Sequence, residues 1–216
     1  MKNMRTFIFV NGNIDNYMTV QEAIDTNDLI VAVDGGYSHL KKLGIIPDVL
    51  IGDMDSISPE ELTNLETQEV DIIRYPAEKD ETDLELALDY VIRYGFDHII
   101  IVAAFGGRLD QALTNLFLIT DSRFKGKKIE FFDGTELVYI IDAQIEFTGK
   151  IGDRVSLIPV LGQADGIYTA GLKFQLDNET LFPEKSRGIS NEIVSENVKI
   201  TIKSGRLLCI HTQVKY

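Results

Sequence analysis

Four groups of polar residues in the first part of the chain have the types and spacing that phosphate chemistry needs. Their aspartates supply hard oxygen ligands, which suit Mg²⁺, and their glycines let a backbone approach an anion closely. The groups are Asp34-Gly35-Gly36, Gly52-Asp53-Met54-Asp55-Ser56, Lys79-Asp80-Glu81-Thr82-Asp83 and Gly106-Gly107-Arg108-Leu109-Asp110.

Asp53 and Asp55 are two residues apart, so in an extended segment both side chains would point the same way and Met54 the other way. Two carboxylates that face one space suit Mg²⁺, which commonly shares its ligands with phosphates. The alternative is a surface turn, because Asp is a frequent turn former. If the other polar groups lie at the same edge of the fold, the metal site is favoured.

Gly106-Gly107-Arg108 has the character of a phosphate-binding loop. A helix N-terminus after the loop would present free N–H groups, and the forked guanidinium matches phosphate oxygens. The alternative is a tight turn with an exposed arginine. Similarly, Lys79 beside Asp80 could be plain surface charge, and Asp34 could cap a helix that starts near Tyr37.

Each polar group must be positioned by a strand before it or a helix after it. Unbroken Ile/Val runs predict strands buried on both faces, at residues 6–10, 29–33, 49–51, 71–75 and 98–104. Ligands of such sheets bind beyond the carboxyl ends of the parallel strands. We therefore expect all four groups at one edge of one sheet.

Helices are predicted between these strands. Thr19-Val20-Gln21-Glu22, Ser58-Pro59-Glu60-Glu61 and Thr82-Asp83-Leu84-Glu85 fit capping boxes, and Gly44 and Gly95 fit helix ends. This alternation predicts an α/β domain with a mostly parallel sheet over residues 1–126. Beyond Gly126-Lys127 the helical pattern stops, and short strands predict a small antiparallel sandwich or barrel over residues 127–216. The strands are expected at 128–133, 137–142, 144–147, 154–160, 166–176, 189–194, 198–203 and 207–213.

Charge and composition narrow the function further. The net charge is 21 − 34 = −13, of which residues 1–126 carry 10 − 22 = −12, so nucleic acid and anionic membranes are disfavoured as partners. No apolar stretch is long enough for a membrane helix, and the run after Met1-Lys2-Asn3-Met4-Arg5 is too short for a signal peptide. The single Cys209 favours the reducing cytoplasm and a place in the core. P-loop, Gly-x-Gly-x-x-Gly, zinc and catalytic-triad patterns are absent from the sequence.

Taken together, these motifs resemble the thiamine pyrophosphokinase family. Val33-Asp34-Gly35-Gly36 and Pro47-Asp48 join the other three groups in the family's order and spacing. Gln111, where many relatives have His, and Phe174, where some have Trp, depart from the pattern. In the second part the matching segments are Gly152-Asp153-Arg154-Val155-Ser156-Leu157-Ile158-Pro159, Gly171-Leu172-Lys173-Phe174 and Gly188-Ile189-Ser190-Asn191-Glu192.

The resemblance implies Mg²⁺-dependent transfer of pyrophosphate from ATP to the thiamine hydroxyl, giving thiamine diphosphate and AMP. It also implies a C-terminal β-sandwich that binds thiamine, and a homodimer with its active sites at the subunit interface. Catalytic positions would be Asp53, Asp55, Asp80, Asp83 and Asp110, the first four of them also holding the metal. ATP would be bound by Asp34, Gly35, Gly36, Lys79, Gly106, Gly107 and Arg108, and thiamine by Phe174, Ser190 and Asn191.

The chemistry inferred from the residues agrees with this. ATP needs divalent cations at an aspartate-lined site, and the thiazolium cation suits an acidic pocket with an aromatic face. Three alternatives stay open: another ATP-dependent kinase acting on a heterocyclic alcohol, a Mg²⁺-dependent phosphohydrolase, and a non-catalytic thiamine- or nucleotide-binding regulator. The intact set of aspartates speaks against the regulator.

Overall fold

The computed structural model describes residues 5–214, and the chain divides into two compact units, residues 1–134 and 135–216. The first four residues, which enter the signal-peptide argument, lie outside the described part. Among residues 5–214, no helix is both long and apolar enough to cross a membrane.

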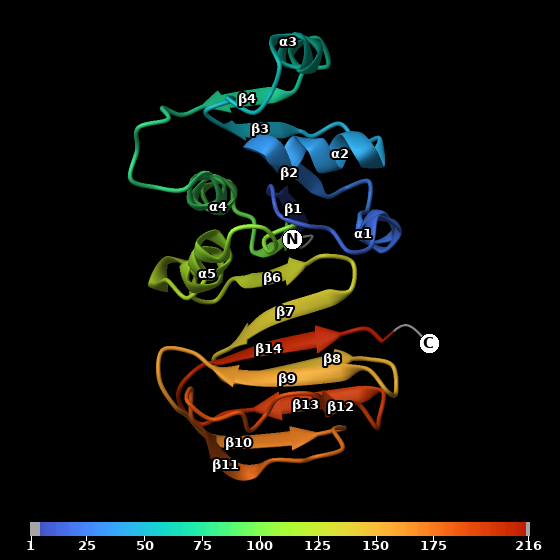
Figure 1. Cartoon of the computed structure of the whole chain (residues 1–216), viewed down its shortest axis with the longest axis vertical. Helices are drawn as coiled ribbons and strands as arrows, with labels where there is room; N and C mark the ends of the chain where they lie inside the picture. Colours follow the sequence, from blue (N-terminus) through green and yellow to red (C-terminus); the bar gives the residue numbers. More distant parts are fainter. Residues whose placement is uncertain (1–4, 215–216) are drawn as a thin grey trace. The chain divides into compact units, whose positions relative to one another are not determined.

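The first unit is built on a parallel sheet with the strand order β6-β5-β1-β2-β3-β4 (Figure 1). Its central strands are buried on both faces, as their unbroken Ile/Val runs predict. The five strands expected in this part are confirmed. Their bounds, with β6, are β1 Arg5–Phe9, β2 Leu29–Val33, β3 Val49–Gly52, β4 Asp71–Arg74, β5 His98–Val102 and β6 Lys128–Phe132.

The strand order reverses at β1. The chain runs outward from β1 through β2 and β3 to β4, then returns to β5 on the other side of β1. Connections that leave two neighbouring strands in opposite directions open a crevice beyond their carboxyl ends, which is where ligands bind in such sheets. The loops after β1 and β5 therefore flank the expected binding position.

The helices begin and end where local capping dictates. Ser58 accepts the N–H of Glu61 at 3.3 Å in a full capping box, and Thr82 accepts the N–H of Glu85 at 3.2 Å. The box predicted at Thr19 is wrong, because Asn16 caps this helix three residues earlier, and Asn is the stronger cap. The helices are α1 Tyr17–Ala23, α2 Tyr37–Leu43, α3 Pro59–Thr67, α4 Asp83–Arg93 and α5 Leu109–Leu118, with short 3₁₀ turns at Asp34–Gly36 and Ser122–Phe124.

β6 corrects the predicted organisation. Its residues were expected in the antiparallel part, but β6 pairs in parallel with β5 and belongs to the first unit. Its apolar side chains are buried there, among them Phe131 at 1% exposure. The units therefore divide after Gly134 rather than near Gly126.

The second unit is a sandwich of two antiparallel sheets, ordered β12-β9-β14-β7 and β11-β10-β13-β8. Both sheets contribute to one apolar core, which includes Cys209, Val155 and Ile200. Burial raises the pKa of the Cys209 thiol to about 12, as expected for a core residue. The strands are β7 Glu136–Ile141, β8 Gln144–Thr148, β9 Arg154–Pro159, β10 Ala164–Ala170, β11 Asp177–Leu181, β12 Asn191–Glu192, β13 Asn197–Thr201 and β14 Leu207–Thr212.

Candidate functional site

A cavity of about 510 Å³ lies at the predicted edge of the parallel sheet, and we call it the N-terminal cavity. All four polar groups contribute to its wall, so the structure brings them together as the sheet topology predicts. The predicted site residues that line it are Asp34, Gly35, Asp55, Asp83, Gly106, Arg108 and Asp110.

Three carboxylates crowd together beside one lysine near this cavity. Burial, the contact with Asp83 and the charge of Asp53 raise the pKa of Asp34 to about 7, although the N–H of Met54 works in the opposite direction. Lys79 Nζ lies 2.8 Å from Asp83 Oδ1. Burial alone would lower the pKa of Lys79, but the three aspartates raise it. One ammonium therefore faces three carboxylates, which leaves an excess of negative charge.

The Asp53–Asp55 segment is not extended, and that prediction is wrong. Met54 has a φ of 68°, and Asp55 donates its N–H to Asp53 Oδ1 at 3.0 Å, so the segment turns. Asp55 thereby reaches the cavity wall. The N–H of Met54 donates to Asp34 Oδ1 at 3.2 Å, so this turn also holds Asp34.

The backbone is strained at three of the loops that carry the site. Asp34, Met54 and Ala103 have φ values of 43°, 68° and 59°, in the loops after β2, β3 and β5. Such left-handed conformations are unfavourable for residues with a Cβ and occur often at binding sites. At Gly52 an added Cβ would lie 2.0 Å from Asp34 Oδ1, so glycine is required where the carboxylate packs over the chain.

The glycine loop leads directly into α5. Arg108 is the N-cap residue of α5 and makes no side-chain cap bond, and its guanidinium pairs with the Asp110 carboxylate at 2.5 Å. This pairing lowers the pKa of Asp110. Arg108 is exposed, as in the tight-turn alternative, yet it also lines the cavity.

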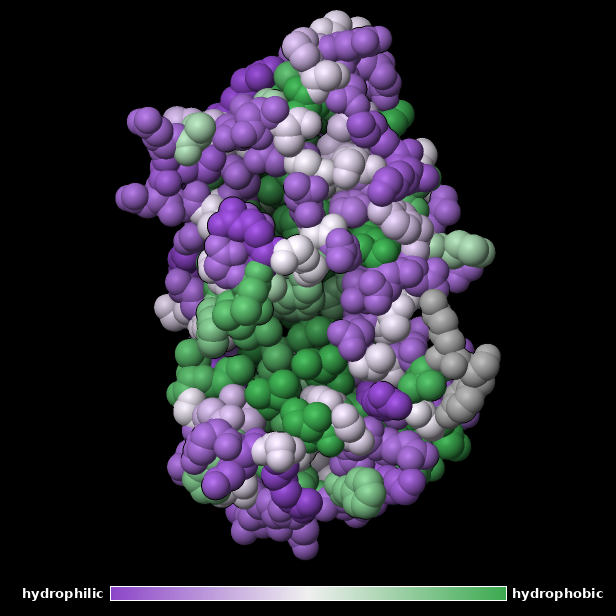
Figure 2. All heavy atoms as spheres, in the orientation of Figure 1, coloured by the Kyte–Doolittle hydropathy of each residue, from purple (hydrophilic) through white to green (hydrophobic). Residues whose placement is uncertain are grey.

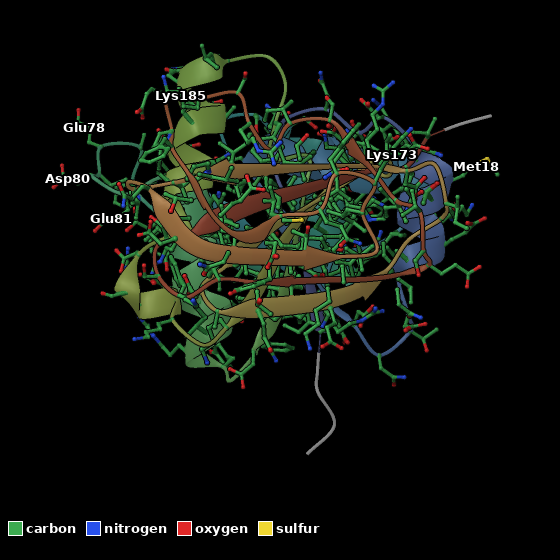
Figure 3. The ribbon with its side chains drawn as sticks, turned by 90° about the horizontal axis from the view of Figure 1, so that it is seen from below. Met18, Glu78, Asp80, Glu81, Lys173 and Lys185 are labelled. Carbon is green, nitrogen blue, oxygen red and sulfur yellow. The ribbon has the colours of Figure 1, made fainter. Side chains whose placement is uncertain are left out.

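Some predicted residues are not part of the cavity wall. Gly36 is buried, and a Cβ there would lie 2.0 Å from Phe9 O, so it serves the close packing of α2 on β1. Gly107 is exposed with a φ of 78°. Asp80 is exposed and points away from the body of the protein, as do Glu78 and Glu81 on the same loop (Figure 3).

The cavity wall includes residues that were not predicted, among them Asn11, Gly12, Thr114 and Asn115. Asn11-Gly12 follows β1 at the same kind of position as the other groups follow their strands. The rule that located those groups therefore also applies to this loop. Asn115 donates to Ala104 O at 2.9 Å and anchors the chain after β5.

In the second unit the structure brings Phe174 and Asn191 together. The Phe174 ring is 61% exposed, whereas Asn191 is 8% exposed. The Asn191 amide accepts the Phe174 N–H at 3.0 Å and donates to Phe174 O at 2.7 Å. Ser190 is exposed, has a φ of 56° and donates its N–H to Ser156 Oγ at 3.0 Å. Asn191 is therefore placed to hold the backbone that presents the Phe174 ring.

The donor set near the N-terminal cavity fits a divalent cation shared with phosphates. Within residues 5–214, no cluster of three or more His, Cys, Asp or Glu side chains could hold a metal ion by itself. However, Mg²⁺ is usually bound through one or two carboxylates together with substrate phosphates. Burial first, and then the neighbouring Asp83 and Asp53, raise the pKa of Asp34, and a cation at this position would favour its charged form.

Comparisons with known proteins agree over both units. The family described as "Thiamin pyrophosphokinase, catalytic domain" matches residues 20–131, and "Thiamin pyrophosphokinase, vitamin B1 binding domain" matches residues 141–207. Thiamine pyrophosphokinase of Bacillus subtilis is 29% identical over 212 residues, covering 97% of this chain and 99% of the relative. A crystal structure of the Bacillus subtilis protein matches with a TM-score of 0.87 at 26% identity, covering 98% of this chain and 100% of the other. Thiamin pyrophosphokinase from Candida albicans shares the fold, with a TM-score of 0.78 at 18% identity, over 98% of this chain and 90% of that one.

Proposed function

The chain belongs to the thiamine pyrophosphokinase family, and from this premise we propose that its N-terminal cavity binds ATP with Mg²⁺ while Phe174 contacts thiamine. The reaction itself is that of the family: the enzyme transfers pyrophosphate from ATP to thiamine. Thiamine diphosphate and AMP are the products. The observation that carries the site assignment is the convergence of four polar groups on one cavity.

The excess negative charge explains why a metal is needed. ATP is strongly anionic, and the carboxylates of Asp34, Asp53 and Asp83 would repel its phosphates. We assign one or two of these three carboxylates as ligands of Mg²⁺ together with the ATP phosphates, with Asp55 beside them at the cavity wall. When bound, Mg²⁺ neutralises charge on the transferred group. Asp80 stays a prediction and is not included in this proposal, because its side chain faces solvent.

The other residues in and near the cavity position the phosphates. Gly106 lines the cavity, and the first turn of α5 presents N–H groups toward an anion. Arg108 supplies a fork for phosphate oxygens once it leaves Asp110. Lys79 supplies a second cation beside Asp83. Pyrophosphoryl transfer depends mainly on such positioning and charge neutralisation.

In the second unit, the exposed ring of Phe174 is suited to a flat cationic heterocycle. An aromatic face attracts a thiazolium through stacking and through its quadrupole. The buried Asn191 amide fixes the backbone of Phe174 on both its N–H and its C=O. Asn191 thus supports the thiamine site by holding Phe174, while Ser190 is exposed beside it.

A homodimer is the assembly that we propose, and α5 supports it. None of the residues of α5 is buried, and Leu109, Leu113 and Phe117 are 73%, 48% and 47% exposed along one side of the helix. Figure 2 shows hydrophobic side chains gathered over this helix. An apolar stripe of this kind is typical of a surface that a partner covers. A second copy of the chain would cover it and would also bring another acidic cavity close.

A reducing compartment such as the cytoplasm is proposed as the location. The buried thiol of Cys209 supports this, because it is a core residue with no disulfide role among the described residues.

The experiment that tests the assignment is incubation with ATP and thiamine over a Mg²⁺ titration. We expect AMP and thiamine diphosphate to form in equal amounts and only with the cation. A phosphohydrolase would release phosphate without thiamine, and a binding regulator would form no product. Equal product formation in excess chelator would overturn the Mg²⁺ assignment.

A further inference from the structure

A buried histidine outside the site connects to the cavity wall. His39 on α2 is 6% exposed, and its Nε2 lies 3.0 Å from Gly12 O in the loop after β1. Its Nδ1 lies 2.7 Å from the hydroxyl of Tyr17 on α1. Lys42 Nζ donates to the same hydroxyl at 3.2 Å. A hydrogen-bonded chain therefore runs from the surface to Gly12, which lines the N-terminal cavity.

The chemistry of the partners fixes where the protons lie. A carbonyl oxygen can only accept, so His39 Nε2 carries the hydrogen that Gly12 O receives. Nδ1 of the neutral ring then accepts from Tyr17. Burial lowers the pKa of His39, and the charge of Lys42 lowers it further, against the bond to Gly12. The imidazole is thus held in one tautomer by both neighbours.

The loop that His39 anchors is itself joined to the glycine loop. The N–H of Gly12 donates to Ala103 O at 2.8 Å, and the N–H of Asn13 donates to Phe105 O at 2.6 Å. A Cβ at Gly12 would lie 2.2 Å from Phe105 O, so the two loops touch closely. The Asn13 side chain packs against Gly106, where a Cβ would lie 2.5 Å from its Cγ. Movement of the loop after β1 would therefore displace Gly106.

We infer that His39 is a positioning residue of this enzyme: through its Nε2–H bond to Gly12 O it sets the loop after β1, and through that loop the glycine loop of the nucleotide site. This inference rests on the proposed assignment of ATP to the N-terminal cavity. His39 contacts no substrate in this scheme. Its effect is on the geometry of the residues that do.

Two substitutions separate this role from simple packing. In His39→Gln the side-chain amide extends to about the position of Nε2 and can still donate to Gly12 O. In His39→Asn the amide extends only to about the position of Nδ1, so it keeps a partner for Tyr17 but loses Gly12. A role confined to joining α1 and α2 would make Asn the milder change, whereas the positioning role makes Gln the milder one.

The test measures KM for ATP, KM for thiamine, kcat and the thermal midpoint of both variants. We expect KM for ATP to rise about tenfold in His39→Asn, because one orienting hydrogen bond is lost. In His39→Gln it should stay near the wild-type value. KM for thiamine should not change. His98→Asn is the matched control, because His98 begins β5 and bonds to Glu130 instead of to a cavity loop. It should leave KM for ATP unchanged.

The outcomes distinguish the inference from the site assignment on which it rests. If Asp83→Asn weakens ATP binding but His39→Asn leaves KM for ATP unchanged in a folded protein, the positioning role is wrong. If Asp83→Asn also leaves ATP binding unchanged, the assignment of ATP to this cavity is wrong instead. If KM for ATP rises equally in His39→Gln and His39→Asn, His39 acts only through packing.

Discussion

Replacing Asp34 by Asn should stabilise the ligand-free protein above neutral pH while removing activity. The Asn side chain has nearly the same shape, so it fits over Gly52 and can still accept the N–H of Met54 through its oxygen. It removes the charge that faces Asp83 and Asp53. The change therefore relieves a repulsion without opening a cavity.

The direction of the pH effect on stability follows from proton binding by Asp34. Burial and the neighbouring carboxylates raise the pKa of Asp34 from 3.8 to about 7, so between these values the native state holds a proton that the unfolded state has lost. Wild-type stability from this group therefore falls as pH rises from about 4 to about 7 and is constant above. The full shift corresponds to about 4 kcal/mol. Because the group is only half-buried, screening by solvent reduces this to about 1–2 kcal/mol.

Urea unfolding at several pH values from about 4 to about 8 measures this difference. Asp34→Asn should match the wild type near the acid end and exceed it by about 1–2 kcal/mol at the alkaline end. Asp80→Asn is the matched control, since its exposed side chain is far from such crowding, and it should show no pH-dependent gain. A stability difference that is independent of pH, or a loss at alkaline pH, would refute the reasoning.

The other site residues give four further predictions. Asp53→Asn or Asp55→Asn should remove most activity with the fold intact, because each removes a hard anionic ligand; normal turnover of both at saturating Mg²⁺, with unchanged circular dichroism, would contradict this. Arg108→Lys keeps the charge but loses the fork, so the affinity for ATP and the turnover rate should both fall, and unchanged kinetics would leave Arg108 a surface residue. Phe174→Ala should weaken thiamine binding by about 1–3 kcal/mol in calorimetry and spare ATP, with the oligomeric state checked in the same sample. Asn191→Ala should weaken thiamine binding and lower the thermal midpoint together, because Phe174 loses two backbone hydrogen bonds.

The parallel sheet and the convergence of the polar groups were predictable for a physical reason. Strands buried on both faces leave long Ile/Val runs, as at β2 and β5, and their carboxyl ends must share one edge. The loop after β1 also lies at the carboxyl end of a strand. It was not predicted as part of the site, because Asn11 and Gly12 are uncharged. His39 could not be found this way, since its partners lie on α1 and in that loop.

Other features depend on backbone geometry that residue types do not reveal. The turn at Met54 has a left-handed backbone, and both the bond from its N–H to Asp34 and the burial of its side chain hold this non-glycine residue there. Long-range contacts decide which sheet β6 joins, because an apolar strand fits either sheet. β11 was not predicted, because Asp177–Leu181 is mostly polar and lacks an alternating pattern.

The strain and the charge at the site have a common consequence for how the enzyme binds its substrates. Left-handed residues after β2, β3 and β5 each cost about 1–3 kcal/mol, and the carboxylate cluster adds its repulsion. These costs lie at the ends of strands whose cores are fully buried, as at Ile51 and Ile101, so the sheet holds the loops in place without a ligand. A cation and phosphates that enter the cavity would then meet residues already positioned, and would relieve the repulsion rather than create new order. Binding should accordingly stabilise the first unit chiefly through charge, so Asp34→Asn, which removes part of that charge beforehand, should show a smaller rise in thermal midpoint with Mg²⁺ and ATP than the wild type.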